Sequence, residues 1–260
     1  MFNQQLFEKH LSTSWLGRSF YYFEELASSN TQAKKIMGDS PLHGAVVLTD
    51  HQRGGRGQHQ RKWETMPGEN LTFSLIFEPK KNERFTLLTL ACALAVSECI
   101  NNEAQITTHL KWPNDILHKK KKLCGILTET QFSGNTLDKI IVGIGLNVNQ
   151  QKYGQELSNV ATSLALINSN EYSREKLLAE ILLKIEYNYR LWNQHKPELV
   201  KQINHTLIGY GEWVKLQVNN QELDGDYKFL GVNEAGALVA LNSLLDVQTF
   251  AFEQVRVREL

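Results

Sequence analysis

The chain has 260 residues, 42% of them hydrophobic, which suffices for one large folded domain or for one domain with a small appendage. Its 28 basic residues balance its 28 acidic residues, and this zero formal net charge argues against a generic nucleic-acid binder, since such proteins are usually basic. The three cysteines are an odd number without CxxC spacing, which disfavours a disulfide framework or a zinc ribbon and fits a reducing cytosol.

The sequence does not predict secretion, a membrane span or a histidine-based metal site. Residues 1–20 contain no apolar signal-peptide segment. The most apolar helix candidate, Phe85–Ile100, is too short to cross a bilayer and contains polar residues. The eight histidines show no paired ligand spacing. We therefore expect a cytoplasmic protein without a membrane partner.

The first predicted elements lead into a loop rich in glycine and arginine. Tyr21–Leu26 has the composition of a short strand, and Ser28–Asn30 supplies N-cap candidates for a helix that ends near Met37. Capping alone would explain the serines and asparagine at these positions. Gly44–Thr49 is an apolar run typical of a buried strand, and it runs directly into the loop.

This loop, from Gln52 to Trp63, has three glycines within four positions, a basic run and one large aromatic residue. Glycine lets the backbone approach a ligand closely, and arginine presents a planar fork to phosphate or carboxylate. We interpret the segment as a mobile loop that closes over an anionic ligand. An isolated run of this kind is more often a solvated basic turn, so the interpretation depends on the rest of the chain.

A strand, a helix and a second strand are expected next. Asn70–Glu78 alternates apolar and polar residues, apart from Ile76, and predicts a half-buried strand. Phe85–Ile100 predicts a helix with two of the cysteines on its core face. Ile106–Lys111 predicts a strand that runs into Lys-Trp-Pro-Asn-Asp at positions 111–115, where the proline and the Asn-Asp pair favour a turn.

Four consecutive lysines at positions 119–122 precede a predicted strand at Leu123–Gln131. The first three are expected on a solvated hairpin tip. Lys122 differs because it lies at the strand entrance beside Gly125.

The strand predicted at Asp138–Asn149 has one wholly apolar face, whereas the other face carries Gly143, Gly145 and Asn147. Two glycines on one strand face indicate that another group packs close to the backbone. Close helix packing would explain them, but Asn147 on the same row favours a polar ligand at the C-terminal end of the strand.

The predicted secondary structure changes in the last third of the chain. Ser173–Trp192 predicts an amphipathic helix, and from Thr206 short strands alternate with turn signals, as in a small β-barrel or sandwich. We expect a domain boundary near residue 205, with domains at 1–205 and 206–260.

Five blocks of residues resemble the catalytic core of biotin–protein ligases, and they occur in that family's order. The most specific is the 111–115 block with the glycine- and arginine-rich loop upstream of it. The five blocks are Ser28–Asn30, Gly55–Trp63, Lys111–Asp115, Lys122–Glu129 and Gly143–Asn147.

The resemblance implies an α+β fold of the class II synthetase-like type, with a mixed β-sheet packed against helices and a small C-terminal SH3-like β-barrel. We expect the ligands on one face of the sheet. The other face should be covered by the helices predicted at Ser29–Met37, Phe85–Ile100 and Ser173–Trp192.

The resemblance also implies a ligase that works in two steps. Biotin and ATP form biotinyl-5′-AMP and pyrophosphate, and a lysine amine on the biotin carboxyl carrier domain of a carboxylase then displaces AMP. Attack of one anion on another needs positive charge, which arginine and lysine side chains supply, while Mg²⁺ is carried mainly by the ATP phosphates. A loop that orders over the adenylate would keep it from water.

Site roles follow from the resemblance, position by position. The catalytic candidates are Lys122, Arg56, Lys111 and Asp115. Lys122 is implied to contact the biotin carboxylate and later the adenylate, and Asp115 to orient an amine unless it only shapes the turn. The implied ligand-binding residues are Ser28, Ser29, Asn30, Gln52, Gly55, Arg56, Gly57, Arg61, Trp63, Asn114, Lys122, Gly125 and Asn147. Those assigned to biotin are Ser28, Ser29, Gln52 and Arg56. Trp63 and Asn114 are assigned to adenine, Arg61 to the triphosphate, and Asn147 to phosphate or metal.

The loop departs from the family's pattern at two positions. Gln58 replaces an arginine and Gln60 replaces a glycine. Gln58 can hydrogen-bond but carries no charge, so we hypothesise that Arg61 and Lys122 bear more of the phosphate charge here. Gln60 predicts a stiffer loop than the pattern does.

Other functions share parts of this pattern. A lipoate–protein ligase shares the fold and the adenylate chemistry, and a non-catalytic biotin sensor would bind biotin without releasing pyrophosphate. Many bacterial members of the family carry an N-terminal DNA-binding domain. Residues 1–20 leave no room for one, so we expect a ligase without repressor function and without DNA as a partner. A monomer and a homodimer both remain open.

Overall fold

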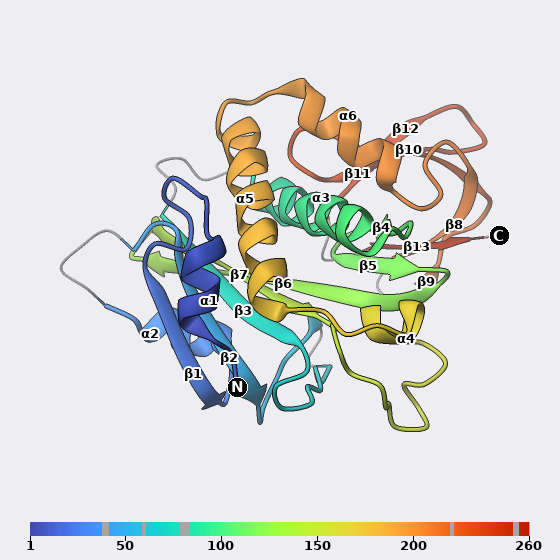
Figure 1. Cartoon of the computed structure of the whole chain (residues 1–260). Helices are drawn as coiled ribbons and strands as arrows, with labels where there is room; N and C mark the ends of the chain where they lie inside the picture. Colours follow the sequence, from blue (N-terminus) through green and yellow to red (C-terminus); the bar gives the residue numbers. More distant parts are fainter. Residues whose placement is uncertain (38–41, 59–60, 79–83, 219–220, 252–254, 260) are drawn as a thin grey trace.

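The structure is a computed structural model of the whole chain, and it describes residues 1–37, 42–58, 61–78, 84–218, 221–251 and 255–259 (Figure 1). Its main feature is a seven-stranded sheet in the order β1-β2-β3-β7-β6-β5-β4. Only β1 and β2 pair in parallel. The strands are β1 (Phe20–Leu26), β2 (Ala45–Gln52), β3 (Leu71–Phe77), β4 (His109–Lys111), β5 (Asp115–His118), β6 (Lys121–Ser133) and β7 (Thr136–Leu146).

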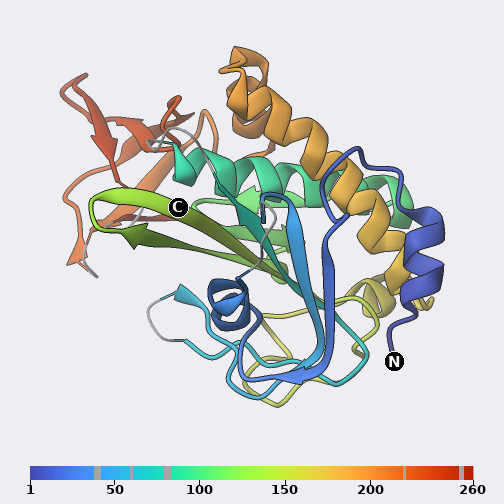
Figure 2. The same ribbon diagram turned by 90° about the vertical axis from the view of Figure 1, so that its left-hand side faces the viewer.

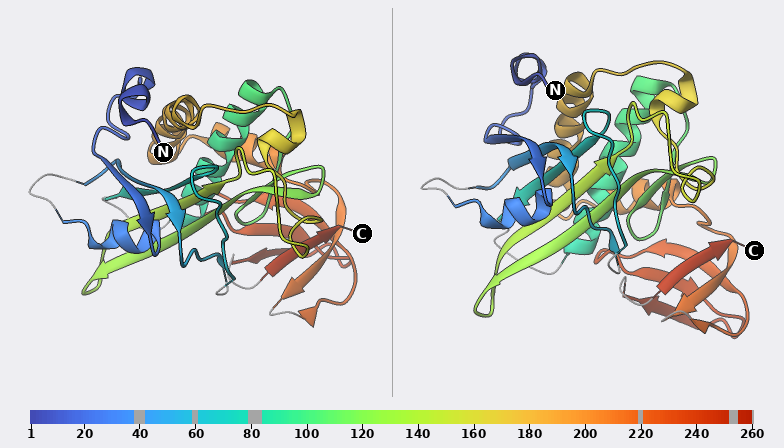
Figure 3. Two further views of the ribbon diagram at one scale, coloured as in Figure 1. Left: turned by 60° about the horizontal axis from the view of Figure 1, so that its bottom comes forward. Right: turned by 90° about the horizontal axis from the view of Figure 1, so that it is seen from below.

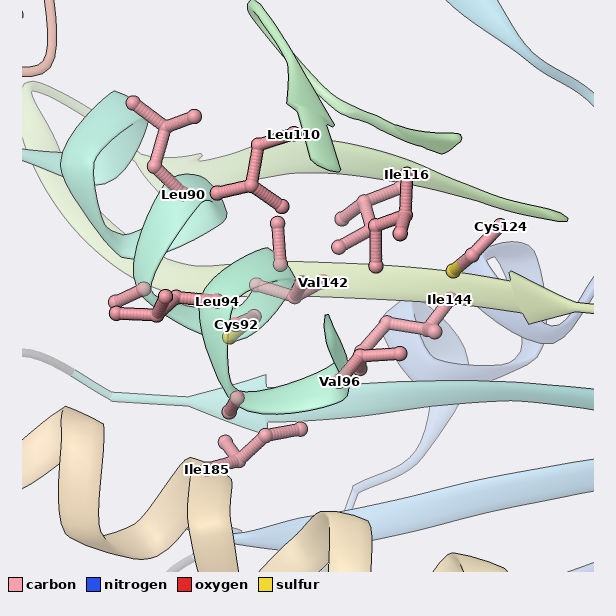
Figure 4. Close-up of a cluster of buried hydrophobic side chains, with 14 of the residues drawn as sticks. Leu90, Cys92, Leu94, Val96, Leu110, Ile116, Cys124, Val142, Ile144 and Ile185 are labelled. Atoms are coloured by element: carbon pink, nitrogen blue, oxygen red, sulfur yellow. The ribbon is translucent and has the colours of Figure 1, made fainter. Parts of the chain in front are cut away.

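Helices lie on both faces of this sheet, and the largest two share one face (Figure 2). The helices are α1 (Gln4–His10), α2 (Ser29–Lys35), α3 (Phe85–Ala104), α4 (Leu164–Asn168), α5 (Arg174–Asn193) and α6 (Pro197–Thr206). The α3 helix is buried on nearly all sides because the sheet, α5 and α6 all pack against it. Figure 4 shows part of this core, with the labelled side chains Leu90, Leu94, Val142, Ile144 and Ile185.

The period-two pattern of β7 explains why its residues pack into different apolar clusters on the two faces of the sheet. Val142 and Ile144 point into the core beside α3, whereas Ile141 belongs to a small apolar cluster on the opposite face. That small cluster also contains Ala33 and Ile36 from the α2 region. The predicted division of β7 into two faces is therefore confirmed.

The side predicted for α2 was wrong. Helix α2 packs on the sheet face opposite α3 and α5, because the apolar residues of the α2 region contact Val47, Ile76 and Ile141 on that face. The same contact corrects the prediction for β3, which is buried along its whole length rather than half-buried. Ile76, the one exception to the alternation, belongs to the apolar cluster of the α2 region.

A buried ion pair joins α5 to the sheet. Arg174 Nη1 lies 2.6 Å from Asp50 Oδ1, and both side chains are 7% exposed. The hydroxyl of Tyr22 and the backbone N–H of Phe2 donate to Asp50 Oδ2. Burial alone would raise the pKa of Asp50, but the hydrogen bonds from Arg174 and Tyr22 and the charge of Arg174 outweigh it and lower that pKa.

The C-terminal residues form a second, antiparallel sheet that curls into a half-barrel, as the SH3-like prediction requires (Figure 3). Its path is β12-β11-β10-β8-β13, and β9 pairs with β8. Trp112 ties it to the main sheet, because its indole N–H donates to the carbonyl of Gly236. The strands are β8 (Trp213–Val218), β9 (Gln221–Glu222), β10 (Tyr227–Val232), β11 (Leu238–Leu241), β12 (Val247–Phe250) and β13 (Val255–Glu259).

Several elements differ from their predicted form. Residues 1–20 and the connection after β7 contain the short helices α1 and α4, and α6 was also not predicted. The turn in the 111–115 block ends at Asn114, so Asp115 begins a strand, β5. Helix α3 is longer than expected, so its length does not exclude a membrane span, but 72% of its most apolar window is buried as in a core helix.

The three cysteines are free thiols in the core, and the core position predicted for Cys92 and Cys99 is confirmed. Burial raises the pKa of the Cys92 and Cys99 thiols to about 12, and it raises the pKa of Cys124 as well. None of the three is therefore a thiolate near neutral pH.

Candidate functional site

A transverse row of the main sheet forms, apart from its first residue Thr49, the floor of a cavity of about 990 Å³. Residues paired across neighbouring strands share one face of a sheet, and this row lies on the face that α2 covers. In order across the strands, the row is Thr49, Thr72, Gly145, Gly125, Asp115 and Lys111. Every predicted site residue except Gly55 lines the cavity.

The glycines of the floor are required by what lies on them. A Cβ at Gly145 would stand 2.5 Å from Trp63 Cζ2, and one at Gly125 would stand 3.0 Å from Trp63 Cζ3. A Cβ at Gly143 would stand 2.9 Å from the amide carbon of Asn30. The prediction of close packing on this strand face is confirmed, with a helix side chain over one glycine and the loop tryptophan over the other two.

The glycine- and arginine-rich segment is a narrow hairpin. The N–H of Trp63 donates to the carbonyl of Gly55 at 2.9 Å, and the N–H of Gly57 donates to the carbonyl of Arg61 at 2.7 Å. Gly55 lies outside the cavity, but a Cβ there would collide with the Trp63 carbonyl, so its role is in the hairpin itself. Gln58 lines the cavity, and the prediction for Gln60 lies outside the described residues.

The residues at the start of α2 do more than cap it. Ser28 accepts a hydrogen bond from the N–H of Thr31, as an N-cap does. Ser29 instead donates its N–H to Gln52 Oε1 at 2.7 Å and pairs its hydroxyl with Ser74 at 2.8 Å. Ser74 in turn donates to Asn30 Oδ1 at 2.6 Å. The capping explanation thus holds for Ser28, while its neighbours anchor the helix to the sheet.

Glu129 joins α2 to the hairpin, and no role was predicted for it. Its carboxylate accepts from Asn30 Nδ2 at 2.8 Å and from Lys34 Nζ at 3.1 Å, and it lies 3.6 Å from Arg56 Nη2. Burial would raise the pKa of Glu129, but these hydrogen bonds and positive charges outweigh it and lower that pKa. Period-two alternation from Gly125 places Glu129 on the glycine face, which is the signal that could have identified it.

Arg56 reaches away from the hairpin towards α2. Its Nη2 donates to Thr31 Oγ1 at 3.0 Å, beside the Glu129 carboxylate. Half of the side chain is exposed, so a ligand in the cavity can still meet it.

A β-bulge aims Lys122 into the site. Asp115 pairs with Gly125 and Ile116 with Cys124, but Leu117 pairs with Lys122, so Leu123 is an extra residue in β6. Leu123 and Cys124 both enter the core, and the shift turns Lys122 to the glycine face. Regular alternation would have placed Lys122 on the opposite face from Gly125.

Asp115 and Trp63 hold the Lys122 ammonium group in place. Lys122 Nζ lies 2.6 Å from Asp115 Oδ1 and 5.4 Å from the centre of the Trp63 ring. The Lys122 ammonium group is thus the charge partner of Asp115 Oδ1. The backbone of Lys122 is fixed too, since its N–H donates to the Val160 carbonyl.

The two asparagines assigned to ligands brace the backbone around this lysine. Asn114 Nδ2 donates to the Ile126 carbonyl at 2.6 Å, and Asn147 Nδ2 donates to the Thr162 carbonyl at 2.9 Å. Both side chains line the cavity while making these contacts.

The remaining predicted cations face the cavity without a charge partner. Arg61 and Lys111 line it, and within the described part of the chain no carboxylate forms an ion pair with either. Together with Arg56 and Lys122 they make the cavity suited to an anion. Among the described residues, no group of three or more His, Cys, Asp or Glu side chains could hold a metal ion.

Comparison with known proteins gives a consistent result. Residues 22–147 match the sequence model of the biotin/lipoate A/B protein ligase family. The chain is 34% identical over 233 residues to the bifunctional ligase/repressor BirA of Bacillus subtilis, covering 88% of this chain and 71% of that protein. It is 28% identical over 198 residues to the biotin–[acetyl-CoA-carboxylase] ligase of Mycobacterium tuberculosis, covering 74% and 69% of the two chains. A biotin protein ligase from Aquifex aeolicus, solved in complex with biotin and ATP, superposes with a TM-score of 0.81 at 30% identity, covering 94% of this chain and all of that one.

Proposed function

Because the chain belongs to the biotin/lipoate A/B protein ligase family and is a ligase, we propose that it forms biotinyl-5′-AMP from biotin and ATP and transfers biotin to a carrier-domain lysine. The observation that carries this proposal is the aim of Lys122. A bulge, an ion pair with Asp115 and the ring of Trp63 direct its ammonium group over a glycine floor.

The first step joins two anions. A carboxylate oxygen of biotin attacks the α-phosphorus of ATP, the bond to the bridging oxygen breaks, and pyrophosphate leaves. Lys122 binds the carboxylate and then the adenylate, and Arg56, Arg61 and Lys111 offset the charge that gathers on the phosphates. These four cations line one cavity, which supports their assignment to the ligands of one reaction.

The second step is acyl transfer. The neutral amine of the acceptor lysine attacks the acyl carbon, the amide bond forms, and AMP leaves with the former carboxylate oxygen. Asp115 is a positioning residue in both steps, because its carboxylate holds Lys122. The hairpin lies over the floor and shields the mixed anhydride from water.

Further parts of the proposal rest on the same site. Mg²⁺ is carried by the ATP phosphates, Trp63 and Asn114 hold adenine, and Ser28, Ser29 and Gln52 face the biotin ring. The acceptor is the biotin carboxyl carrier domain of a carboxylase, and the enzyme works in the cytoplasm as a monomer or homodimer. Residues 1–205 form the catalytic domain and 206–260 a smaller domain, from which Gln217 and Val257 reach the cavity.

A mass-shift experiment tests the substrate. The full chain is incubated with ATP, Mg²⁺ and an acceptor carrier domain, and with either biotin or lipoate. The proposal expects the mass of a biotinyl group on one acceptor lysine and no change with lipoate. Lipoylation without biotinylation would establish the lipoate ligase, and biotin binding without pyrophosphate release would establish a sensor.

A further inference from the structure

Thr72 carries a buried hydroxyl that has no partner in the described part of the chain. It lies in β3, its side chain lines the cavity, and the residue is 3% exposed. Its Oγ1 makes no hydrogen bond. A buried polar group without a partner destabilises a fold, so nearly all such groups are bonded in native proteins. The exception at Thr72 therefore calls for a partner that comes from outside the chain.

The neighbouring hydroxyls on this face are all satisfied. Thr49, beside Thr72 on β2, donates to the His51 carbonyl at 2.9 Å. Ser74, two residues along β3, is bonded to both Ser29 and Asn30. Thr72 thus differs from other hydroxyls in the same environment. Its lack of a hydrogen-bond partner is not a general property of this face of the sheet.

The other neighbour of Thr72 offers its hydroxyl no partner. Thr72 pairs with Gly145, which has no side chain to meet the hydroxyl. The indole of Trp63 lies over Gly145, and its Nε1 is also buried without a partner. Thr72 Oγ1 and Trp63 Nε1 are thus two hydrogen-bonding groups of the cavity lining that have no partner in the described part of the chain.

The position of Lys122 decides which part of biotin meets Thr72. The carboxylate belongs near the Lys122 ammonium group, over Gly125 on β6. Thr72 lies two strands away in the same row, a separation of about 10 Å from the usual strand spacing. Ser29 and Gln52, which the proposed function places at the biotin ring, meet at the β3 side of the row, so a biotin whose carboxylate lies at Lys122 presents its ring at Thr72. The ureido group of the biotin ring offers a carbonyl acceptor and N–H donors, either of which complements the Thr72 hydroxyl.

We propose that Thr72 is a specificity-determining residue whose hydroxyl hydrogen-bonds the ureido group of biotin. This inference rests on the proposed function. A ring without hydrogen-bonding groups, such as the dithiolane of lipoate, leaves the hydroxyl unpaired and is disfavoured for that reason.

Three variants of the full chain test the inference by calorimetric titration with biotin, with desthiobiotin and with ATP. Thr72→Val keeps the β-branched shape and removes the hydroxyl, and Thr72→Ser keeps the hydroxyl. Thr49→Val is the matched control, because it removes a neighbouring hydroxyl that is already bonded within the chain. We expect Thr72→Val to weaken biotin and desthiobiotin binding by about 10-fold, as for one lost hydrogen bond, and to leave ATP binding unchanged. Thr72→Ser and Thr49→Val should bind biotin within about threefold of wild type.

Thermal unfolding separates ligand recognition from a structural role. Thr72→Val removes an unpaired polar group, so the Tm without ligand should stay equal or rise, while the gain in Tm on adding biotin should shrink. Wild-type affinity for biotin in Thr72→Val, or a loss for biotin but not for desthiobiotin, would overturn the inference and leave the proposed function intact. Wild-type protein that does not bind biotin would overturn both.

Discussion

Replacing Gly145 by alanine probes whether the indole of Trp63 must rest on the sheet. The Cβ would stand 2.5 Å from Trp63 Cζ2 and 2.6 Å from Nε1. Carbon atoms in contact lie about 3.5 Å apart or more, so the ring must retreat by about 1 Å. Gly145 is not in the left-handed region, so alanine adds a steric effect without backbone strain.

The substitution can lower either the free energy of unfolding or the affinity for ATP, depending on whether Trp63 can move. Overpacking costs about 1–3 kcal/mol when the neighbours cannot move. Trp63 belongs to a hairpin rather than to the core, so it can move, and the unfolding free energy should change little. The steric clash then destabilises the state in which Trp63 lies over the sheet beside the bound ligand. We therefore expect ATP affinity to drop by about 10-fold, which corresponds to about 1.4 kcal/mol.

Calorimetric titration with ATP, with thermal unfolding in parallel, measures both quantities. Gly154→Ala is the matched control, because a Cβ there would meet nothing within 4 Å. Trp63→Phe supplies a smaller ring, so its effect and that of Gly145→Ala should not add. Unchanged ATP affinity in Gly145→Ala, or additive effects in the double variant, would refute the idea that ring and floor act together.

Three further predictions concern stability, thiol reactivity and the hairpin. Asp50→Asn leaves the Arg174 cation buried without a counter-charge and should cost about 3–5 kcal/mol in urea unfolding. Because folding lowers the pKa of Asp50, the stabilisation that its carboxylate gives the folded state is complete above about pH 4 and is lost as the pH falls through the folded pKa. The unfolding free energy of the variant should therefore fall less in acid than that of the wild type. The three cysteines should react with a thiol reagent only after unfolding, and rapid labelling of native protein would contradict their burial. Gln58→Arg should slow release of the adenylate into solution, measured by single-turnover quench; an unchanged rate would count against the role given to this position.

Sequence periodicity and composition predicted the structural features that depend on residues close together in the chain. The two faces of β7 and the Ser28 N-cap follow from local rules and are confirmed. The half-barrel at the C-terminus followed from its turn signals and from the family resemblance. The predicted ligand residues, Gly55 excepted, also come together around one cavity, although their roles remain proposals.

Several of the features that were missed depend on tertiary contacts. Amphipathicity does not say which face of a sheet a short helix covers, and for α2 this was decided by Ile76 and Ile141. The bulge at Leu123 reverses the facing of Lys122, and a one-residue shift of this kind leaves no mark in an apolar run. Helix α1 buries one residue, too few to produce a visible period, whereas α6 has Pro197 in its first turn and Leu199 and Ile203 four residues apart, a local signal that was overlooked.

Pyrophosphate exchange into ATP measures the activation of biotin alone, which is the step that we propose Lys122 promotes. Wild-type protein should exchange pyrophosphate only when biotin and ATP are both present. Lys122→Ala should lower the rate by about 100-fold or more, as for loss of a group that stabilises a charged transition state. Lys121→Ala, which removes an exposed neighbouring lysine, should retain the wild-type rate. Exchange that does not need biotin, or an undiminished rate in Lys122→Ala, would contradict the account.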